Sequence, residues 1–411
     1  MAHLQRRWVV LTGCFLTWFM LGSVQTFTLF IDAWRKEFGW SLPALSFAAA
    51  VQFAVNGLFS PIGGKLADRF GTKRVLVTYI VALGVGALAV GHITSLWQLV
   101  FIQGVIFGAA SGLGPIVSPL LARWFVQRRG LAFALAPSGH HLGRGAFAPV
   151  VVTLMAMAGW RAPWLLMGVL ILLMLLPFVL LTFRDSPSRE NADSGKLSDA
   201  IRQGHRTAEG ALVGEALRTS PFWLIFAGFL VCGSTAQPMI IHLAPLAWEG
   251  GLGQSEAGTA LAILGIMAFF GLLSSGIATD RFGGSKTLVF YYLSRSFGFL
   301  FLLLFLFWPD PRLLYLGMGI IGFFGRGTGP AVRSLLTNCF GVRSLGTLVG
   351  LILMIHQLAS AFWIFMGGFL FQRTGTYSGY LIASVVMLLG ASIVSWYIQE
   401  RRCYVPVEAT V

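Results

Sequence analysis

Gly63-Gly64-Lys65-Leu66-Ala67-Asp68-Arg69-Phe70-Gly71 lies between two apolar runs of a 411-residue chain. A similar stretch, Ser275-Gly276-Ile277-Ala278-Thr279-Asp280-Arg281-Phe282-Gly283, follows about 212 residues later and is also flanked by apolar runs. A short Gly/Asp/Arg turn that recurs at half the chain length predicts an internal duplication. In so apolar a protein, the two copies are expected to be homologous membrane bundles with a binding site between them.

The composition is that of a membrane protein. Hydrophobic residues make up 56% of the chain and charged residues 11%, and the mean hydropathy is +0.78. Each spanning helix needs about 20 apolar residues, which accounts for this excess. The first apolar stretch follows Arg6-Arg7 and runs through Phe30. It is too long for the core of a signal peptide, so we expect it to be retained as the first helix.

Twelve apolar segments predict an all-α membrane protein with twelve transmembrane helices in two pseudo-symmetric six-helix bundles. The segments are 9–31, 42–64, 75–93, 97–122, 130–157, 163–183, 220–246, 256–278, 287–308, 313–336, 346–371 and 377–398. Residues 184–219 lack an apolar run and are predicted to be a cytoplasmic linker. The predicted domains are therefore an N-terminal bundle, 1–183, and a C-terminal bundle with a short cytoplasmic tail, 220–411.

The net charge of +14 does not indicate nucleic-acid binding, because the cations concentrate on one side of the membrane. The loops predicted on that side contain Arg6, Arg7, Lys65, Arg69, Lys73, Arg74, Arg123, Arg128, Arg129, Arg281, Lys286, Arg343, Arg401 and Arg402. The opposite loops contain only Arg35, Lys36, Arg161, Arg312 and Arg373. This positive-inside bias places both termini in the cytoplasm. The compact length favours a multi-pass protein of a bacterial inner membrane, acting as a monomer.

Two further pairs of matches support the duplication. Gly112-Leu113-Gly114-Pro115 corresponds to Gly327-Thr328-Gly329-Pro330, and Phe38-Gly39-Trp40-Ser41 corresponds to Gly251-Leu252-Gly253-Gln254-Ser255. With these motifs, nearly the whole chain resembles a major facilitator superfamily transporter. Its two Asp-Arg turns are similar to the signature that this superfamily has between helices 2 and 3 and, in weaker form, between helices 8 and 9.

A second resemblance concerns the branch of the superfamily. Trp124-Phe125-Val126-Gln127-Arg128-Arg129-Gly130-Leu131-Ala132, followed by Ser138-Gly139, resembles the entry to helix 5 in monocarboxylate transporters and in oxalate/formate antiporters. The chain departs from both patterns. Helix 8 lacks the Asp and Arg, and helix 1 the Lys, that are common in monocarboxylate transporters. Helix 11 has His356 where the antiporters have a Lys. Lactate-type proton symport therefore does not carry over residue by residue.

The repeated turns are candidates for a gate. Asp68 is expected near the N-terminus of the third helix, where the helix dipole favours a carboxylate. With Arg69, Asp280 and Arg281 it is interpreted as part of a latch that holds the two halves together. The alternative is a charged loop that only follows the topology rule. Arg333, near the same side of the membrane, is interpreted as a gate or entry residue.

Arginines inside predicted helices are the most informative residues. Arg144, Arg295 and Arg326 fall within spans, whereas every Asp and Glu is assigned to a loop or a helix end. A buried unpaired charge is costly, so the expected partner is an anionic substrate, which the planar guanidinium binds well. Arg326 and Arg144 are therefore the candidate substrate anchors, one in each half. Arg295 is interpreted as extending toward Asp280 or the lipid headgroups.

Neutral polar residues and histidines complete the candidate site. Gln25, Asn56 and Gln237 are candidate substrate-binding residues, against the alternative of hydrogen bonds between helices. His140, His141 and His356 are candidates for proton coupling, because histidine is the ordinary proton carrier left in the membrane. The alternatives are that the substrate carries the proton or that none moves. His140 and His141 are adjacent, so at most one is expected to face the cavity.

No catalytic or cofactor motif is found, and no enzyme activity is expected. The four cysteines lie far apart, so neither a disulfide nor a metal site is expected. The leading hypothesis is secondary active transport of an organic anion, a mono- or polycarboxylate, by alternating access. Two alternatives remain open: an exporter of drugs or amphiphiles, which ordinarily needs a membrane-embedded acid, and a non-transporting sensor on the same fold.

Overall fold

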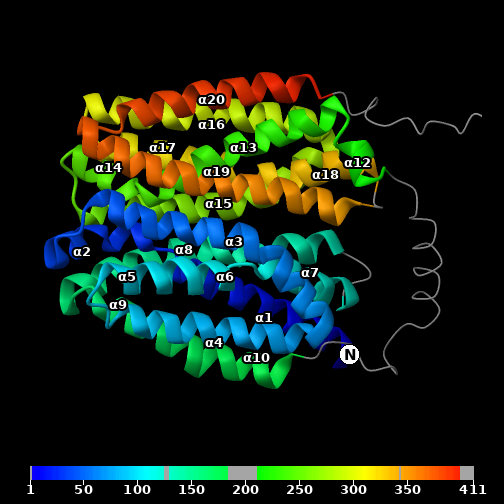
Figure 1. The fold of residues 1–411 in the computed structure, drawn as a ribbon, viewed down its shortest axis with the longest axis horizontal. Coiled ribbons are helices and arrows are strands. Elements are labelled where there is room, and N and C mark those ends of the chain that lie inside the picture. Colours follow the sequence, from blue (N-terminus) through cyan, green and yellow to red (C-terminus); the bar gives the residue numbers. More distant parts are fainter. Residues whose placement is uncertain (1, 125–128, 184–210, 342–343, 399–411) are drawn as a thin grey trace, which may run out of the picture.

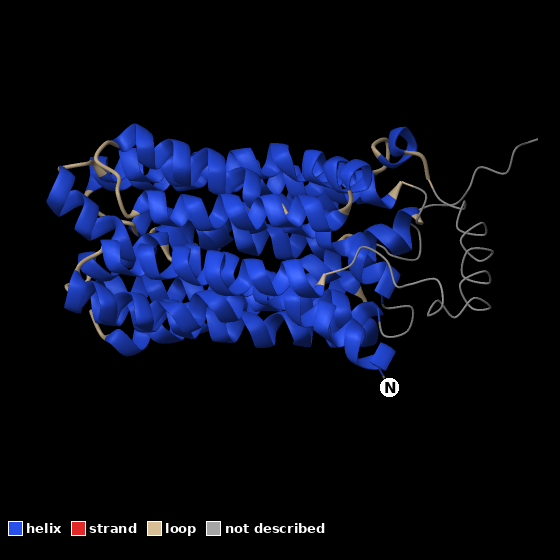
Figure 2. Cartoon of the chain, turned by 90° about the horizontal axis from the view of Figure 1, so that it is seen from below, coloured by secondary structure: helices blue, strands red, loops and turns tan. Residues whose placement is uncertain are grey.

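The computed structural model describes residues 2–124, 129–183, 211–341 and 344–398. These residues form helices that run alongside one another in two stacked bundles (Figures 1 and 2). Within these ranges, ten helices are long and apolar enough to cross a membrane, and the fourth and tenth predicted spans are formed by interrupted helices. The predicted all-α fold with twelve spans in two bundles is thereby confirmed. The predicted linker falls largely on 184–210, outside the described residues, so the domain boundaries stay a prediction.

The N-terminal bundle follows the predicted order of six spans. Its elements are α1 (Ala2–Val24), η1 (Phe27–Phe30), α2 (Ile31–Phe38), α3 (Leu42–Phe70), α4 (Thr72–Val90), α5 (Leu96–Leu99), η2 (Val100–Ile106), α6 (Phe107–Ala110), α7 (Leu113–Trp124), α8 (Arg129–Ala158), α9 (Arg161–Leu170), η3 (Ile171–Leu175) and α10 (Leu176–Thr182).

The C-terminal bundle repeats this order. Its elements are α12 (Val213–Ala216), α13 (Ser220–Ile241), α14 (Leu243–Glu249), α15 (Gln254–Phe282), α16 (Gly284–Phe307), α17 (Pro311–Arg326), α18 (Thr328–Phe340), α19 (Leu345–Thr374) and α20 (Ser378–Trp396). We call the end of the molecule where α10 stops and α13 starts the linker end, and the end that carries α2 the far end (Figure 1).

The repeated motif is helical except for its last glycine. α3 continues through Phe70, and α4 begins directly after Gly71, which has φ +89°. Gly283 makes the same break between α15 and α16, with φ +87°. Only glycine adopts this backbone readily, so a single residue reverses the chain. The expectation for Asp68 is therefore wrong: it lies in the last turn of α3 and not at the start of the next helix.

Matched helix crossings reproduce the duplication in three dimensions. In the N-terminal bundle, a Cβ atom placed on Gly22 of α1 would lie 2.0 Å from the carbonyl oxygen of His140 in α8. In the C-terminal bundle, a Cβ atom on Gly233 of α13 would lie 2.2 Å from the carbonyl oxygen of His356 in α19. Small residues let helix backbones approach closely in membranes. These two crossings fix the heights of His140 and His356.

The two bundles meet along α3 with α19 and α8 with α15 (Figure 1). Their contact is tightest from mid-depth to the far end. There a Cβ on Gly265 would lie 2.6 Å from the backbone nitrogen of Gly145, and one on Gly368 would lie 2.9 Å from the Cβ of Ser46. Hydrogen bonds join the halves at the same end. The amide of Ala244 donates to Thr28 Oγ1 at 2.9 Å, and Gln254 Nε2 donates to the carbonyl oxygen of Leu29.

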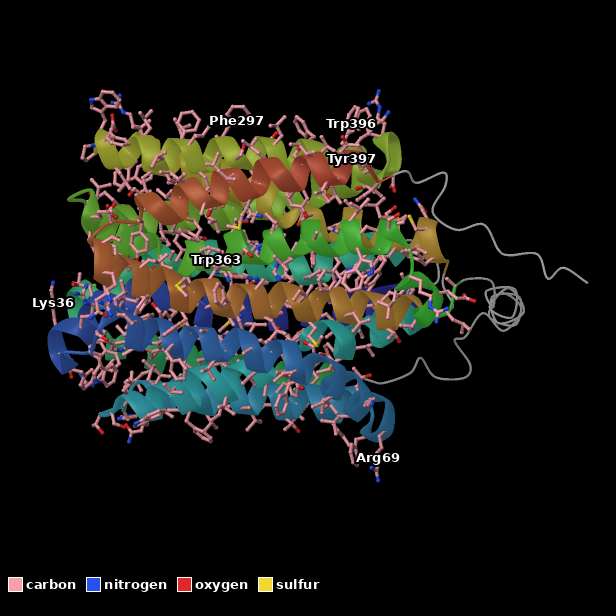
Figure 3. All side chains as sticks on the ribbon, turned by 45° about the horizontal axis from the view of Figure 1, so that its top comes forward. Lys36, Arg69, Phe297, Trp363, Trp396 and Tyr397 are labelled. Atoms are coloured by element: carbon pink, nitrogen blue, oxygen red, sulfur yellow. The ribbon has the colours of Figure 1, made fainter. Side chains whose placement is uncertain are left out.

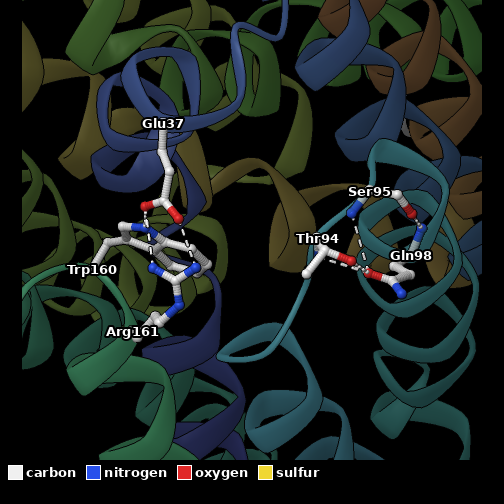
Figure 4. Close-up of polar contacts among 6 residues, drawn as sticks. All are labelled: Glu37, Thr94, Ser95, Gln98, Trp160 and Arg161. Carbon is white, nitrogen blue, oxygen red and sulfur yellow. Dashed lines mark hydrogen bonds and ion pairs between the residues drawn. The ribbon is translucent and has the colours of Figure 1, made fainter.

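Short polar contacts order the turns of the far end (Figure 4). Glu37 of α2 accepts from both terminal nitrogens of Arg161, at 2.6 and 3.1 Å, and from Trp160 Nε1 at 2.6 Å. Nearby, Gln98 Oε1 accepts the amide of Ser95 at 3.2 Å and so caps α5. Both side chains of the Glu37–Arg161 pair are partly exposed, and such pairs contribute less than about 1 kcal/mol. Their role is to fix α2 against α9.

Apolar side chains cover the outer surface of the C-terminal bundle (Figure 3). Phe297, Trp396 and Tyr397 project away from the bundle and are more than half exposed. Lys36 and Arg69 mark the far end and the linker end. A surface of this kind suits lipid, with aromatic residues near the helix ends where the headgroups lie.

Candidate functional site

A cavity of about 840 Å³ lies between the two bundles. Nine of the residues singled out in the sequence line it: Gln25, Asn56, His140, His141, Gln237, Asp280, Arg326, Arg333 and His356. The wall also contains aromatic side chains that were not predicted, namely Trp18, Phe53 and Phe229. The structure therefore brings most of the candidate residues to one place.

The cavity extends toward the linker end. Asp280, in the last turn of α15, and Arg333, on α18, line it there, and both are exposed. No residue of η1, α2 or α14 lines it, because these elements belong to the closed far end. The structure thus shows a two-bundle protein that is closed at the far end and hollow toward the linker end.

Interrupted helices meet the cavity at equivalent places in the two halves. α6 ends at Ala110 and α7 starts at Leu113, while α17 ends at Arg326 and α18 starts at Thr328. The breaks coincide with the repeated Gly-Leu-Gly-Pro and Gly-Thr-Gly-Pro motifs. Helix breaks at corresponding positions of two repeats indicate a substrate site, because the freed backbone groups face a cavity.

Arg326 is the last residue of α17, directly before the break in the C-terminal half. It lines the cavity, and its Nη2 atom is buried without a hydrogen-bond partner. Among the described residues, the recorded ion pairs are Lys36–Asp32 and Arg161–Glu37, both at the far end. No acidic side chain described in the structure therefore pairs with Arg326, as the sequence argument requires.

Arg144 stands behind the cavity wall rather than in it. Its side chain is 1% exposed and is not among the lining residues. Nη2 donates to Gln25 Oε1 at 2.7 Å, while Nε and Nη1 have no partner. Gln25 follows the end of α1 and lines the cavity, so it separates the guanidinium from the open space. Direct contact of Arg144 with a substrate stays a prediction.

The two adjacent histidines both line the cavity, so the expectation that at most one would do so is wrong. Their ring centroids lie 5.0 Å apart with the planes nearly perpendicular. His140 Nε2 lies 2.9 Å from Gln25 Oε1, and His141 Nδ1 is buried without a partner. Neighbouring side chains on a helix point in different directions, so the cavity extends around α8 far enough to reach both His140 and His141.

A polar chain crosses between the halves beside the cavity. His356 Nδ1 lies 3.1 Å from Gln357 Oε1, Gln357 Nε2 donates to Asn56 Oδ1, and Asn56 Nδ2 donates to the carbonyl oxygen of Gly108 at 3.4 Å. Gln357 was not predicted as a site residue. Gln357 links α19 to α3. A change in the hydrogen bonding of His356 therefore reaches, through Gln357, the contact between the two bundles. Gln237 lines the cavity from α13.

The sequence interpretation of Arg295 is wrong. Arg295 is fully buried in the C-terminal bundle and does not extend toward the headgroups. Its Nη1 lies 3.6 Å from Cys232 Sγ, which is also 3.2 Å from Thr328 Oγ1. Its guanidinium packs beside Gly325, in the last turn of α17. A cation there is favoured by the negative end of the helix dipole.

Arg69 and Arg281, two of the residues predicted to form a latch, make no hydrogen bond or ion pair with the opposite half among the described residues. The guanidinium of Arg69 lies 5.3 Å from the ring of Phe70, and that of Arg281 lies 5.5 Å from the ring of Phe282. Asp280 and Arg333 line the mouth of the cavity instead. The side chain of Asp68 lies outside the described part, so the latch stays a prediction.

One cysteine departs from expectation. Cys14 and Cys232 are free and buried, as packing residues would be. Cys339 takes part in a disulfide bond, so the expectation of no disulfide is wrong. Its partner lies outside the described residues.

The sequence matches the Major Facilitator Superfamily over residues 13–305 and 243–408. An uncharacterised MFS-type transporter, YhjX of Escherichia coli, is 26% identical and covers 86% of each chain. Monocarboxylate transporter 13 of Bos taurus is also 26% identical, over 94% of this chain and 87% of its own. YcxA of Bacillus subtilis, another uncharacterised MFS-type transporter, is 22% identical over 92% of this chain and 94% of its own.

Solved structures show the same fold. A D-xylose–proton symporter superposes with a TM-score of 0.76 at 14% identity, over 97% of this chain and 99% of that one. A bacterial homologue of the human lysosomal transporter Spinster, inward-facing and unoccupied, superposes with a TM-score of 0.69 at 17% identity, over 98% and 99%.

Proposed function

The chain belongs to the Major Facilitator Superfamily, and we propose that it is a secondary transporter of an organic anion, a mono- or polycarboxylate. The observation that carries this proposal is the state of Arg326. It lines a cavity inside the membrane with one guanidinium nitrogen unpartnered, and no described acidic side chain pairs with it. A guanidinium in a low-dielectric cavity is stabilised by a bound carboxylate. The likeness to a monocarboxylate transporter supports the same class.

In our proposal, transport occurs by alternating access. The positive-inside bias assigns the linker end and both termini to the cytoplasm, so the described state is open inward. Relatives from Escherichia coli and Bacillus subtilis support a bacterial cell membrane. The opposite state requires the far-end contacts to separate while the linker end closes. Asp68, Arg69, Asp280, Arg281 and Arg333 are the proposed latch of that second state.

A cross-link at the far end tests alternating access. We expect Ser46→Cys combined with Gly368→Cys to form a disulfide under oxidation. The Cβ positions lie 2.9 Å apart, and a small separation of α3 from α19 brings them to the distance of about 3.5–4.5 Å that a bridge needs. Oxidised protein should lose uptake almost completely and reduced protein should regain it. The two single variants, treated alike, are the controls. Full uptake by the quantitatively cross-linked protein would contradict the mechanism.

Proton coupling is part of the proposal. His140, His141 and His356 line the cavity, and histidine changes charge within the physiological pH range. The one acidic residue among the lining residues, Asp280, lies at the mouth. A histidine is therefore the proposed proton carrier at mid-depth. The alternatives are a proton carried by the substrate and exchange without protons.

Uptake into proteoliposomes tests the proposed function. Purified protein is given radiolabelled mono-, di- and tricarboxylates and, in parallel, lipophilic cations, each with and without an inward proton gradient. We expect saturable uptake of at least one carboxylate and none of the cations. Transport of cations alone would favour the drug exporter, and binding without transport would favour a sensor. Carboxylate uptake that ignores the proton gradient would remove the histidine proposal.

A further inference from the structure

Gln25 holds a position between a buried charge and the cavity. Its Oε1 atom accepts from Arg144 Nη2 at 2.7 Å and lies 2.9 Å from His140 Nε2. Arg144 is 1% exposed and keeps Nε and Nη1 without partners. Among the described residues, one neutral amide oxygen is therefore the only side-chain acceptor for this buried guanidinium.

Arg144 and His140 together provide the hydrogen-bond donors of a carboxylate-binding site, but the acceptor between them is the amide of Gln25. A guanidinium forms two parallel hydrogen bonds with a carboxylate, whereas an amide offers one oxygen and no charge. A buried cation without a counter-ion is costly. The amide oxygen thus stands where a carboxylate oxygen would satisfy Arg144 and His140 better.

The position of Gln25 in the chain allows its side chain to move away from Arg144 and His140. It lies after the end of α1 at Val24 and before η1 begins at Phe27, so its side chain is attached to a helix break. It also lines the cavity. Its side chain can therefore rotate into open space without disrupting a regular helix.

We propose that an acidic group of the substrate displaces Gln25 from Arg144 and His140, and that a second acidic group binds Arg326 in the other half. The transported anion is then a dianion, such as a dicarboxylate. Arg144 lies directly behind Gln25, and Gln25 and Arg326 line the same cavity, so two like charges flank one space and repel each other. A monoanion neutralises one of the two, whereas a dianion neutralises both and connects the bundles. This inference rests on the proposed transport of organic anions.

Substitution of Gln25 tests the displacement. Binding of linear dicarboxylates of three to eight carbons, and of monocarboxylates of equal length, is measured on the purified full chain by calorimetry. We expect wild-type protein to prefer the best dicarboxylate by about 10- to 100-fold, the effect of added charge-assisted hydrogen bonds. Gln25→Glu supplies the missing carboxylate to Arg144. It should raise the melting temperature and reduce the preference to about one.

Two further variants separate this effect from general changes. Gln25→Ala frees Arg144 and should tighten dicarboxylate binding more than monocarboxylate binding, so the preference should rise above that of wild type. Gln52→Glu adds the same charge to the cavity wall at a residue that bonds Gln103 instead. It should weaken dicarboxylates more than monocarboxylates by charge repulsion, but, unlike Gln25→Glu, it should not raise the melting temperature, because it pairs with no buried guanidinium.

The outcomes distinguish this inference from the proposed function. If wild-type protein binds monocarboxylates as tightly as dicarboxylates, or if Gln25→Glu and Gln25→Ala both keep the wild-type ratio, the displacement is wrong while anion transport stands. If wild-type protein binds no carboxylate at all, the proposed function itself fails.

Discussion

Arg326→Ala is expected to abolish anion binding and uptake while the protein stays folded. Removing one partner of a desolvated, hydrogen-bonded charge pair costs about 2–5 kcal/mol. This corresponds to about 30-fold to several thousand-fold weaker affinity. The melting temperature should not fall, because the arginine has an unpartnered buried nitrogen and pairs with no described acidic side chain. Proteoliposome uptake, calorimetry and thermal unfolding measure the three quantities.

Arg326→Lys separates charge from shape. Lysine keeps the positive charge but not the planar fork, so we expect an affinity between those of wild type and the alanine variant. Arg312→Ala is the matched control, because Arg312 is exposed at the start of α17, away from the cavity. Uptake by Arg326→Ala at the wild-type rate would exclude this residue as the substrate anchor.

Gly22→Ala and Gly233→Ala are expected to cause the largest losses of stability. In each case the new Cβ would lie 2.0–2.2 Å from a backbone carbonyl oxygen of the crossing helix. Backbone cannot move aside as a flexible side chain can. Overpacking in well-packed cores typically costs about 1–3 kcal/mol, and we expect at least the upper value here. Thermal unfolding in detergent measures the change.

Gly390→Ala serves as the control for the glycine variants. Gly390 lies inside α20, and a Cβ there meets no atom within 4 Å. Alanine favours helix over glycine by up to about 1 kcal/mol, so this variant should be neutral or slightly more stable. Equal melting temperatures for all three variants would mean that the matched crossings do not limit stability.

Much of the fold follows from periodic features of the sequence. Apolar length predicts the spans, and the repeated Asp-Arg motif predicts the pairing of halves, because both depend on local composition. The break at a single residue, Gly71, was not predicted, since the residues before it are compatible with either a helix or a turn. The tertiary approach of α1 to α8 depends on backbone contacts that no sequence period shows.

The sequence predicted which residue types form the site more successfully than it predicted where their side chains point. Arg326 could be placed in the cavity because it lies within a predicted span, directly before the repeated Gly-Thr-Gly-Pro motif. The burial of Arg295 could not be predicted, because its neighbours Cys232 and Thr328 lie on other helices and carry no charge. The same limit applies to Gln25, whose position over Arg144 depends on how α1 packs against α8.

The scarcity of polar links at the far end bears on the energy of the conformational cycle. Among the described residues, two hydrogen bonds join the halves there, from Ala244 to Thr28 and from Gln254 to Leu29, and each contributes about 0.5–1.5 kcal/mol after exchange with water. Separation therefore gives up roughly 1–3 kcal/mol of hydrogen bonding, an amount that ligand binding of modest selectivity between the two states supplies. The remaining cost of the proposed opening is the packing of α3 against α19 and of α8 against α15, so the close approach of small residues, more than polar bonding, keeps the far end shut.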